Sequence, residues 1–408
     1  MIRSVAHLSL HTSPLAQPGT GYAGGMNVYV HELSKKMAER NIDVVVFTRR
    51  THPNQTEVVH QKPGYRIVNI DAGPSEELLV DSLSHYVNNF SRAVVDWTEK
   101  NTDGFDVIHS HYWLSGWSGI LIKEALGTPL VHSFHTLGRV KENVRRPGEP
   151  PDTPIRSITE EQVLAKSNAV VTSTSREAAD LVHHYGANLK YLHISPPGVD
   201  RTTFSPGNRL RSRKLLGLGA KPIVMYAGRI EAHKGIDIAV NALAKLPERL
   251  MIGQGPPHLY IIGGPSGKRG NHELQLLQNT ALELGIADRV QFLPAQPHSV
   301  LADYYRAANL LIMPSRGESF GLVAVEAQAC GLPIVASDVT GLCRAIATER
   351  SGIIVDTLEP AAFADAAVSL LDNPKRAKQY EKQAIKTASR FSWNSTAETI
   401  LDIYGSIS

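Results

Sequence analysis

Two cations stand five residues apart in a loop that follows a strongly apolar run. Arg229 and Lys234 lie in AGRIEAHKG, at the end of the strand-like run PIVMYAG. A planar guanidinium and a point-charged ammonium suit a diphosphate, and both stabilise the negative charge that develops on a departing phosphate. The glycines of the loop let a ligand approach. The loop predicts a diphosphate site, and a surface loop with unrelated charges is the alternative.

A second candidate site lies in SRGESFGLVAVEAQACGLPIVAS, residues 315–337. An apolar run ends there, a loop carries Glu318, and a helix is expected to begin near Phe320. The backbone N–H groups at that helix start would suit a phosphate. Glu318 and Glu326 would bind hydroxyl groups, which a nucleotide sugar offers on both its hexose and its ribose. Helix capping and solvent exposure are the alternative roles of the two carboxylates.

Four histidines follow two strand-like runs of the first half, His109 and His111 in HSHYWLSG and His132 and His135 in HSFHTLG. We expect His109 and His111 to point to opposite faces of their strand, and no nearby cysteine or carboxylate completes a ligand set. No metal site is therefore predicted. Buried core histidines and contact with a sugar or acceptor remain as the two interpretations.

The stretch PGTGYAGGMNVYVHEL, residues 18–33, places glycines directly ahead of an amphipathic pattern. A helix start near Gly25 or Met26 would let a ligand lie against bare backbone N–H groups. Asn27, in the first turn, offers a donor and an acceptor to a hydroxyl-rich molecule. A flexible surface loop is the alternative.

The elements that must position these residues alternate between strand and helix. Strands are expected at 5–10, 43–48, 65–70, 105–110, 129–134 and 169–174, and then at 222–228, 259–264, 290–294, 310–315, 333–337 and 352–356. Helical patterns of the first half fall at 26–40, 78–100, 115–126, 156–166 and 175–185. Apolar strands that alternate with helices predict an α/β fold of two doubly wound, Rossmann-like domains, with ligands in the cleft between them.

The length of 408 residues suits two domains. The Pro- and Gly-rich stretch at 195–208 is the expected hinge. We predict an acceptor-binding domain at 1–200, a nucleotide-sugar-binding domain at 201–390, and a last helix at 391–408 that crosses back to the first domain.

Composition excludes several classes of protein. The 42 basic and 39 acidic residues give a net charge of +3, which argues against a nucleic-acid partner. Cys330 and Cys343 lack metal-like spacing, which indicates a reducing compartment. The apolar N-terminal run is too short for a signal peptide, and no stretch approaches the length of a membrane span. We expect a cytoplasmic protein without membrane insertion, and a homodimer is left open.

The motifs resemble the retaining glycosyltransferases of family four, which have the GT-B fold. GRIEAHKG and GESFGLVAVEAQACGLPIVAS carry the likeness in the second half. HTSPLAQPGTGYAGGMNVYV, HSHYWLSG and the pair His135–Thr136 resemble the mycothiol-pathway glycosyltransferases, which move N-acetylglucosamine from UDP-N-acetylglucosamine to 1D-myo-inositol 3-phosphate. The likeness runs over nearly the whole chain and implies a nucleotide sugar and a small polar acceptor as partners.

The resemblance also implies residue roles. The catalytic set would be Arg229, Lys234, Glu318 and His135, of which the two cations hold the diphosphate and His135 lies near the sugar. Donor binding would involve Gly25, Ser319, Phe320, Gly321, Leu322 and, at the ribose, Glu326. Acceptor binding would involve Asn27, Tyr112, Thr136 and Arg156.

Two positions depart from the mycothiol pattern. Val80, in AGPSEELLVDSL, replaces a lysine that grips the acceptor phosphate, and one charge-assisted contact worth about 1.5–3 kcal/mol would be missing. Tyr22 replaces an acidic residue before the glycine pair. The alternative function is therefore an antibiotic-pathway glycosyltransferase that uses a UDP- or GDP-sugar and an aminocyclitol or small thiol.

A nucleotide-sugar epimerase or hydrolase and a non-catalytic sensor are disfavoured. The first would not need Asn27 and Arg156, and the second would be expected to lose Lys234 or Glu318.

The expected mechanism is same-face substitution. Double displacement needs a carboxylate on the far face of the anomeric carbon, and these motifs offer no obvious Asp or Glu in the first domain. The acceptor hydroxyl would instead pass its proton to the departing phosphate oxygen, while closure about the hinge excludes water. The chain has no Asp-x-Asp. Arg229 and Lys234 would thus carry the charge without a required cofactor, and Mg²⁺ is left open.

Overall fold

The computed structural model describes residues 2–62, 64–149, 151–250, 255–267, 269–339, 341–346 and 348–407. Its contacts divide the chain into two compact units. Unit 1 contains Met1–Ala16, Gly25–Pro197 and Trp393–Ser408, and unit 2 contains Gln17–Gly24 and Gly198–Ser392. No helix in these described ranges combines the length and the apolar character that a membrane-spanning segment requires.

Unit 1 is built on an eight-stranded sheet with the order β3-β4-β2-β1-β5-β6-β7-β8. Its strands are β1 (Ser4–Leu8), β2 (Asp43–Arg49), β3 (Val58–Gln61), β4 (Tyr65–Ile70), β5 (Val107–His111), β6 (Leu130–Ser133), β7 (Ala169–Thr172) and β8 (Leu192–Ile194). Every pair is parallel except β3–β4. The two edge strands β3 and β8 were not expected, because both are short and neither contains a buried residue.

The helices of unit 1 are α1 (Gly25–Ala38), α2 (Val87–Asn101), α3 (Trp113–Leu126), α4 (Gly138–Asn143), α5 (Pro154–Lys166), α6 (Ser175–Tyr185) and α15 (Trp393–Ile407), with 3-10 turns η1 (Val80–Tyr86) and η2 (Leu189–Tyr191). The helix expected over 78–100 is therefore split in two. Ser84 Oγ donates to the Asp81 carbonyl (3.0 Å), a local bond of the kind that competes with regular α-helix.

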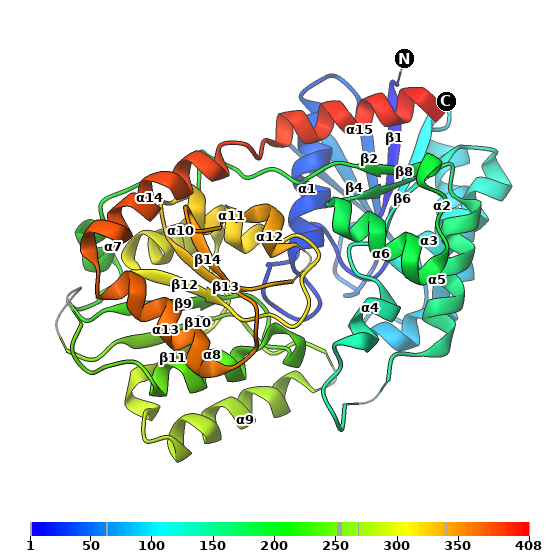
Figure 1. Cartoon of the computed structure of the whole chain (residues 1–408). Coiled ribbons are helices and arrows are strands. Elements are labelled where there is room, and N and C mark those ends of the chain that lie inside the picture. The colour runs from blue at the N-terminus through cyan, green and yellow to red at the C-terminus, as the bar shows by residue number, and fades with distance from the viewer. Residues whose placement is uncertain are drawn as a thin grey trace. The chain divides into compact units, whose positions relative to one another are not determined.

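The last helix, α15, belongs to unit 1 although it closes the chain. Figure 1 shows it beside α1, against which it packs. Thr396 Oγ1 donates to the Pro196 carbonyl (2.8 Å), and the Tyr404 hydroxyl lies 2.7 Å from His109 Nδ1. The helix thus supplies a polar partner to a buried histidine of the sheet.

Unit 2 contains a six-stranded, fully parallel sheet with the order β11-β10-β9-β12-β13-β14. Its strands are β9 (Ile223–Ala227), β10 (His258–Ile262), β11 (Val290–Leu293), β12 (Leu310–Met313), β13 (Ile334–Ser337) and β14 (Gly352–Val355). Its helices are α7 (Arg209–Leu215), α8 (Ile236–Ala244), α9 (Gly270–Glu283), α10 (His298–Ala307), α11 (Leu322–Ala329), α12 (Leu342–Ala345), α13 (Pro360–Leu371) and α14 (Pro374–Ala388), with 3-10 turns η3 (Ala232–Lys234) and η4 (Ala287–Arg289).

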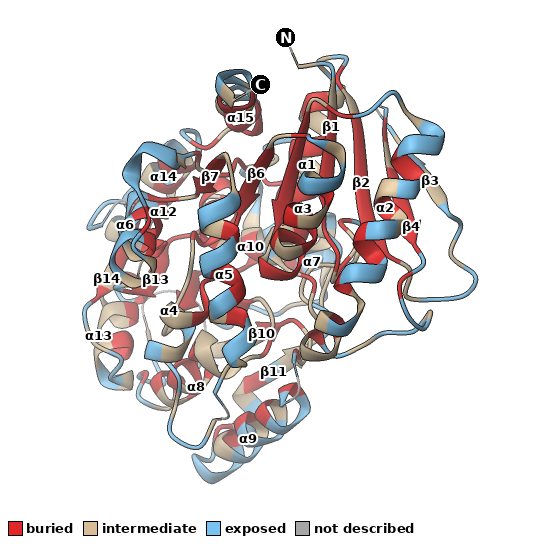
Figure 2. Ribbon diagram, turned by 90° about the vertical axis from the view of Figure 1, so that its right-hand side faces the viewer, coloured by how far each residue is buried: buried red, intermediate tan, exposed pale blue. Residues whose placement is uncertain are grey.

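Strand β9 shows why this sheet is covered on both faces. Val224 and Tyr226 belong to one hydrophobic cluster, which includes Phe363 of α13. Met225 and Ala227, which alternate with them along the strand, belong to a second cluster. Side chains of a strand point alternately to the two faces of its sheet, so both faces are apolar here and both need a layer of helices. Figure 2 shows similar burial along strands β1, β2 and β6 of unit 1, in which only the first residues of β1 and β2 are not buried. The prediction of two doubly wound α/β domains is confirmed.

Candidate active site

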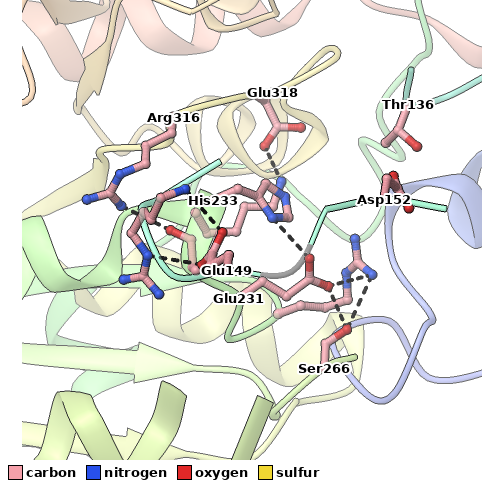
Figure 3. A network of polar contacts seen from close by, with 12 residues as sticks. Thr136, Glu149, Asp152, Glu231, His233, Ser266, Arg316 and Glu318 are labelled. Atoms are coloured by element: carbon pink, nitrogen blue, oxygen red, sulfur yellow. Dashed lines mark hydrogen bonds and ion pairs between the residues drawn. The ribbon is translucent and has the colours of Figure 1, made fainter. Parts of the chain in front are cut away.

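The first predicted cation, Arg229, follows the carboxyl end of β9, the usual side for ligands in such sheets. Its Nη1 lies 2.8 Å from Glu231 Oε1 and 3.4 Å from Ser266 Oγ (Figure 3). Ser266 Oγ donates to the same carboxylate oxygen (2.6 Å), and His233 Nδ1 lies 3.1 Å from the other oxygen. Burial opposes ionisation of Glu231, but Arg229 and His233 outweigh it and hold the pKa of this carboxyl well below its usual value. The guanidinium is thereby fixed in place.

The second cation, Lys234, ends the 3-10 turn η3. Its Nζ lies 2.9 Å from Glu318 Oε2, and the exposed fractions of the two side chains are 16% and 18%. Burial would raise the pKa of Glu318, but Lys234 reverses the effect and lowers it. Gly235 follows with φ +68°, and a Cβ there would lie 1.9 Å from the Pro314 carbonyl oxygen. Only glycine lets this loop pass so close to the end of β12.

A further arginine, which is not among the predicted site residues, holds the same turn in place. Arg316 pairs with both carboxylate oxygens of Asp237 (2.8 and 2.7 Å). Its Nη1 also donates to the Ala232 carbonyl (3.0 Å), and its backbone N–H donates to the His233 carbonyl (2.7 Å). The loop that carries Glu318 and the turn that carries Lys234 are therefore held together. Arg316 lies inside the quoted motif, but only the fold shows its partner.

Helix α11 begins at Leu322, so the start expected near Phe320 is two residues too early. Phe320 is instead buried and packs on Phe391 at a ring-centroid distance of 5.4 Å. Gly321 precedes the helix with φ +89° and, having no side chain, cannot cap it. The first amides of a helix have no partner within the helix, which makes this end suitable for an anion.

Glu326, the second carboxylate of this motif, is 5% exposed on α11 and is not solvent-facing. The Tyr305 hydroxyl donates to its Oε2 (3.4 Å), and burial raises the pKa of Glu326. The same helix therefore offers an anion-binding end and a buried carboxyl that can accept hydrogen bonds. Contact of Glu326 with a ribose remains a prediction.

The glycine-rich loop Gln17–Gly24 belongs to unit 2 by its contacts. The Gly264 N–H donates to the Gly19 carbonyl (2.7 Å), and Gln17 Nε2 donates to the Gln296 carbonyl (2.8 Å). A Cβ at Gly24 would lie 3.3 Å from Arg229 Nε. The loop therefore lies directly beside the predicted diphosphate residue, and the lack of a side chain at Gly24 permits that approach. The interpretation as a flexible surface loop is not supported.

Gly25 is the first residue of α1, as predicted, and Asn27 lies two residues further, in the first turn, with a side chain 1% exposed. Asn27 Nδ2 donates to Thr12 Oγ1 (2.9 Å) and to the Ser13 carbonyl (2.7 Å). The side-chain amide thus ties the helix to the loop after β1, and its contact with an acceptor remains a prediction.

Three predicted acceptor residues of unit 1 meet around Arg156. Its Nη2 donates to Thr136 at both the carbonyl (3.1 Å) and Oγ1 (3.0 Å), and its Cζ lies 5.2 Å from the Tyr112 ring centroid. Nη1 pairs with Asp152 (2.8 Å) and Nε pairs with the fully buried Glu160 (2.8 Å). Arg156 is 2% exposed, so its charge is balanced by two carboxylates.

The loop that leads to Val80 is held by another unpredicted arginine. Arg49, 3% exposed at the end of β2, donates to the carbonyls of Pro74 (2.7 Å) and Glu76 (2.6 Å). Val80 begins η1 and is 9% exposed. The loop is therefore anchored by a cation, but the position of the missing lysine holds a buried aliphatic side chain.

The histidines correct one expectation. His7, His109 and His111 lie close together with 0% exposure, so the prediction that His109 and His111 point to opposite faces is wrong. Residues two apart on a strand share a face, and His7 of β1 is the register partner of His109. Among the described residues, one ring nitrogen from each of these three histidines lies close enough to the other two for a shared metal ion. Both nitrogens of His109, however, are already within hydrogen-bond distance of Tyr404 and Ser133 (2.7 and 2.9 Å).

Comparison with known proteins agrees with this architecture. Two family models match, Glycosyltransferase Family 4 at residues 23–203 and Glycosyl transferases group 1 at residues 209–387. A D-inositol 3-phosphate glycosyltransferase from Xylanimonas cellulosilytica is 44% identical and covers 98% of this chain and 96% of its own. A D-inositol 3-phosphate glycosyltransferase from Corynebacterium efficiens is 41% identical, and the match covers 98% of this chain and 94% of that protein. The structure of sucrose-phosphate synthase from Thermosynechococcus elongatus matches with a TM-score of 0.91 at 31% sequence identity. The match covers 99% of this chain and 98% of that chain.

The fold and these matches define a glycosyltransferase with two Rossmann-like domains. The chain belongs to glycosyltransferase family four, together with proteins named D-inositol 3-phosphate glycosyltransferase. The family that the motifs predicted is confirmed.

The buried histidines predict acid sensitivity. Burial lowers the pKa of His7, His109, His111 and His132, whereas unfolded histidines titrate near pH 6.5. Below pH 6.5 the unfolded chain therefore binds more protons than the folded chain. The free energy of unfolding falls as the pH is lowered through this value. Each of the four histidines should lower the free energy of unfolding by up to about 1.4 kcal/mol when the pH falls from 7.5 to 5.5. Urea denaturation at the two pH values measures this.

Two matched variants distinguish the effect of removing a buried histidine from the effect of removing an exposed one. His132→Asn should reduce the pH dependence of the urea midpoint, whereas His183→Asn, at an exposed position, should leave it unchanged. Equal pH dependence in wild type and His132→Asn would contradict the assignment.

Proposed function

We propose that the protein transfers N-acetylglucosamine from UDP-N-acetylglucosamine to 1D-myo-inositol 3-phosphate with retention at the anomeric carbon. The observation that carries the proposal is the pair Arg229 and Lys234, held by carboxylates at the carboxyl end of β9 beside the start of α11. The acceptor follows the names of relatives that match over nearly their whole length. The donor follows the resemblance of the first-half motifs to the mycothiol-pathway enzymes.

Donor binding would exchange one anion for another. Lys234 Nζ and Arg229 Nη1 are balanced by Glu318 and Glu231. A diphosphate would replace Glu318 on Lys234, and Glu318 would then accept hydrogen bonds from sugar hydroxyls. The amides of Phe320, Gly321 and Leu322 would bind a phosphate.

The chemistry we propose is same-face substitution. The acceptor hydroxyl attacks the anomeric carbon, its proton passes to the departing phosphate oxygen, and the bond from that oxygen to the sugar breaks. Arg229 and Lys234 stabilise the charge that develops on the diphosphate. Their two positive charges fill the role that a metal clamp fills elsewhere, so the mechanism requires no cofactor.

Acceptor binding would depend on Arg156, because Val80 supplies no charge. The acceptor phosphate would replace Asp152 on Nη1 while Glu160 stays on Nε. Asp152 is the more accessible of the two partners, with a side chain 22% exposed against 0% for Glu160. Glu160 would thus hold the guanidinium of Arg156 in position, and the substrate phosphate would displace Asp152.

The direct test is a panel of substrates read by mass spectrometry. UDP-N-acetylglucosamine with 1D-myo-inositol 3-phosphate should give one product heavier than the acceptor by one N-acetylhexosamine residue, together with UDP. Inositol, aminocyclitols, small thiols and GDP-sugars should give little or none. Donor incubated alone should remain intact, since an epimer or free sugar would indicate the disfavoured enzyme classes. Transfer to a thiol or aminocyclitol in preference to the phosphate would refute the proposed acceptor.

Asp152→Asn tests the acceptor exchange. Removing the competing negative charge should lower KM for inositol 3-phosphate by about threefold, the size expected for one partly exposed ion pair. KM for the donor should not change. Steady-state kinetics with either substrate varied measures both values. Glu99→Gln removes an exposed carboxylate elsewhere in unit 1 and serves as control. A raised acceptor KM in Asp152→Asn would instead assign the carboxylate a supporting role.

A further inference from the structure

The buried carboxylate of Glu160 is held by donors from three helices of unit 1. Its Oε1 accepts a hydrogen bond from Arg156 Nε (2.8 Å) on the same helix, α5. The backbone N–H of Gly138, at the start of α4, donates to both oxygens (3.1 and 3.0 Å). The hydroxyl of Tyr185, at the end of α6, donates to Oε2. Glu160 is 0% exposed, so these contacts replace the water that an ionised carboxylate would otherwise bind.

The direction of the bond from Tyr185 follows from its other contact. The backbone N–H of Arg139 donates to the phenol oxygen (3.0 Å) and therefore occupies one of its lone pairs. An ionised carboxylate has no hydrogen to give, so the single O–H of the tyrosine points to Glu160. Burial and the nearby Glu160 carboxylate raise the pKa of Tyr185, which keeps the phenol protonated near pH 7.

The side chain of Tyr185 is itself fixed by its neighbours. Helix α6 ends at this residue, where Gly186 follows with φ +65° and its N–H donates back to the Val182 carbonyl (3.0 Å). The Arg139 guanidinium lies over the tyrosine ring, with Cζ 4.6 Å from the ring centroid. Nη1 of the same arginine donates to the His184 carbonyl. These contacts restrict the rotation of the tyrosine, so its hydroxyl stays at one position beside the carboxylate.

The guanidinium of Arg156 is the group that this arrangement positions. Nη2 binds Thr136 and Nε binds Glu160, whereas Nη1 has Asp152 as its one hydrogen-bond partner among the described residues. The nitrogen that faces the incoming acceptor phosphate is therefore the one whose partner can be replaced. Glu160 fixes Nε more firmly when its other oxygen is also bound, because a carboxylate turns readily about its terminal bond.

We propose that Tyr185 is a positioning residue for acceptor binding, whose hydroxyl holds the Glu160 carboxylate so that Glu160 keeps the Arg156 guanidinium in place for an anionic acceptor. This inference rests on the proposed function for the identity of the acceptor, 1D-myo-inositol 3-phosphate. When the acceptor phosphate displaces Asp152, the guanidinium loses one of the groups that orient it. The donors to Glu160 then keep it in the geometry that a charge-assisted bond to phosphate requires.

Exchange of the Arg156 Nε–H with solvent tests the positioning without any reaction. In the ligand-free, full-length protein labelled with ¹⁵N-arginine, NMR identifies the signal of this group by its loss in Arg156→Lys. Tyr185→Phe removes the hydroxyl alone and should make this N–H exchange about fivefold faster, which corresponds to the loss of one hydrogen bond. Tyr191→Phe, at an exposed tyrosine of the same unit, should leave the rate unchanged. An unchanged rate in Tyr185→Phe would overturn the proposal.

Steady-state kinetics with UDP-N-acetylglucosamine and 1D-myo-inositol 3-phosphate tests the consequence for binding. Tyr185→Phe should raise KM for the acceptor about fivefold and leave KM for the donor unchanged, because the positioned cation belongs to the acceptor site. The side chain introduced in Arg156→Lys carries a single nitrogen, so it cannot bind Glu160 and the phosphate through separate atoms. In that background Tyr185→Phe should change the acceptor KM by less than about twofold.

The outcomes distinguish positioning from stability and from the reaction. If Tyr185→Phe lowers the urea midpoint but changes neither KM, or raises both alike, the residue is only structural and the proposal fails. An equal rise of the acceptor KM in the wild-type and Arg156→Lys backgrounds also contradicts it. If wild type does not transfer sugar to inositol 3-phosphate, the proposed function fails, while the exchange rate still decides whether Tyr185 holds Arg156. Should Arg156→Lys not fold, the difference between the acceptor and donor KM values of Tyr185→Phe decides.

Discussion

The ion pair between Lys234 and Glu318 is the interaction on which the candidate site depends. Both side chains are mostly buried, and an unpaired charge in such a place is costly. The pair is possible because Gly235 lets η3 pass against the end of β12 and because Arg316 ties the two loops together. A diphosphate that replaced Glu318 would supply Lys234 with a new negative partner. The free enzyme therefore holds its cations ready for an anionic ligand.

The same principle governs Arg156 in unit 1. Its charge is balanced by Asp152 and Glu160, of which only Asp152 is partly accessible. A phosphate that replaced Asp152 would leave the other ion pair intact. Val80 is uncharged, so the proposed binding of the acceptor phosphate would depend on Arg156. Donor and acceptor sites would thus both bind anions by substitution for a carboxylate.

Much of the fold could be predicted because its signal is local. Apolar strand runs and amphipathic helices alternate along the chain, and Arg229 follows a strand directly, which places it at a carboxyl end. The short edge strands β3 and β8 lack buried residues and gave no such signal. The partners Glu231 and Asp237 were missed because ion pairing depends on how the loops fold back. The loop Gln17–Gly24 was recognised by its glycines, but its hydrogen bonds to Gly264 and Gln296 come from distant sequence.

The histidines show how one wrong geometric step changes an interpretation. His109 and His111 share a face of β5, and His7 of β1 lies beside them, so they form a cluster rather than two separate contacts. His111 Nδ1 lies 3.0 Å from His135 Nε2, so His135 joins this cluster and is not an isolated residue. Side chains two residues apart on a strand lie on the same face, so the alternation that predicted the sheet also places His109 and His111 on one face.

Calorimetry that compares the affinities of the protein for UDP and UMP decides whether Lys234 binds the second phosphate of the donor. Wild type should bind UDP at least about tenfold more tightly than UMP, as one charge-assisted hydrogen bond implies. In Lys234→Ala that ratio should fall severalfold, with Arg229 and the first amides of α11 left to bind the diphosphate, while Lys245→Ala, an exposed lysine of the same unit, should keep it. Equal affinities for UDP and UMP in wild type, or an unchanged ratio in Lys234→Ala, would show that Lys234 does not bind the second phosphate.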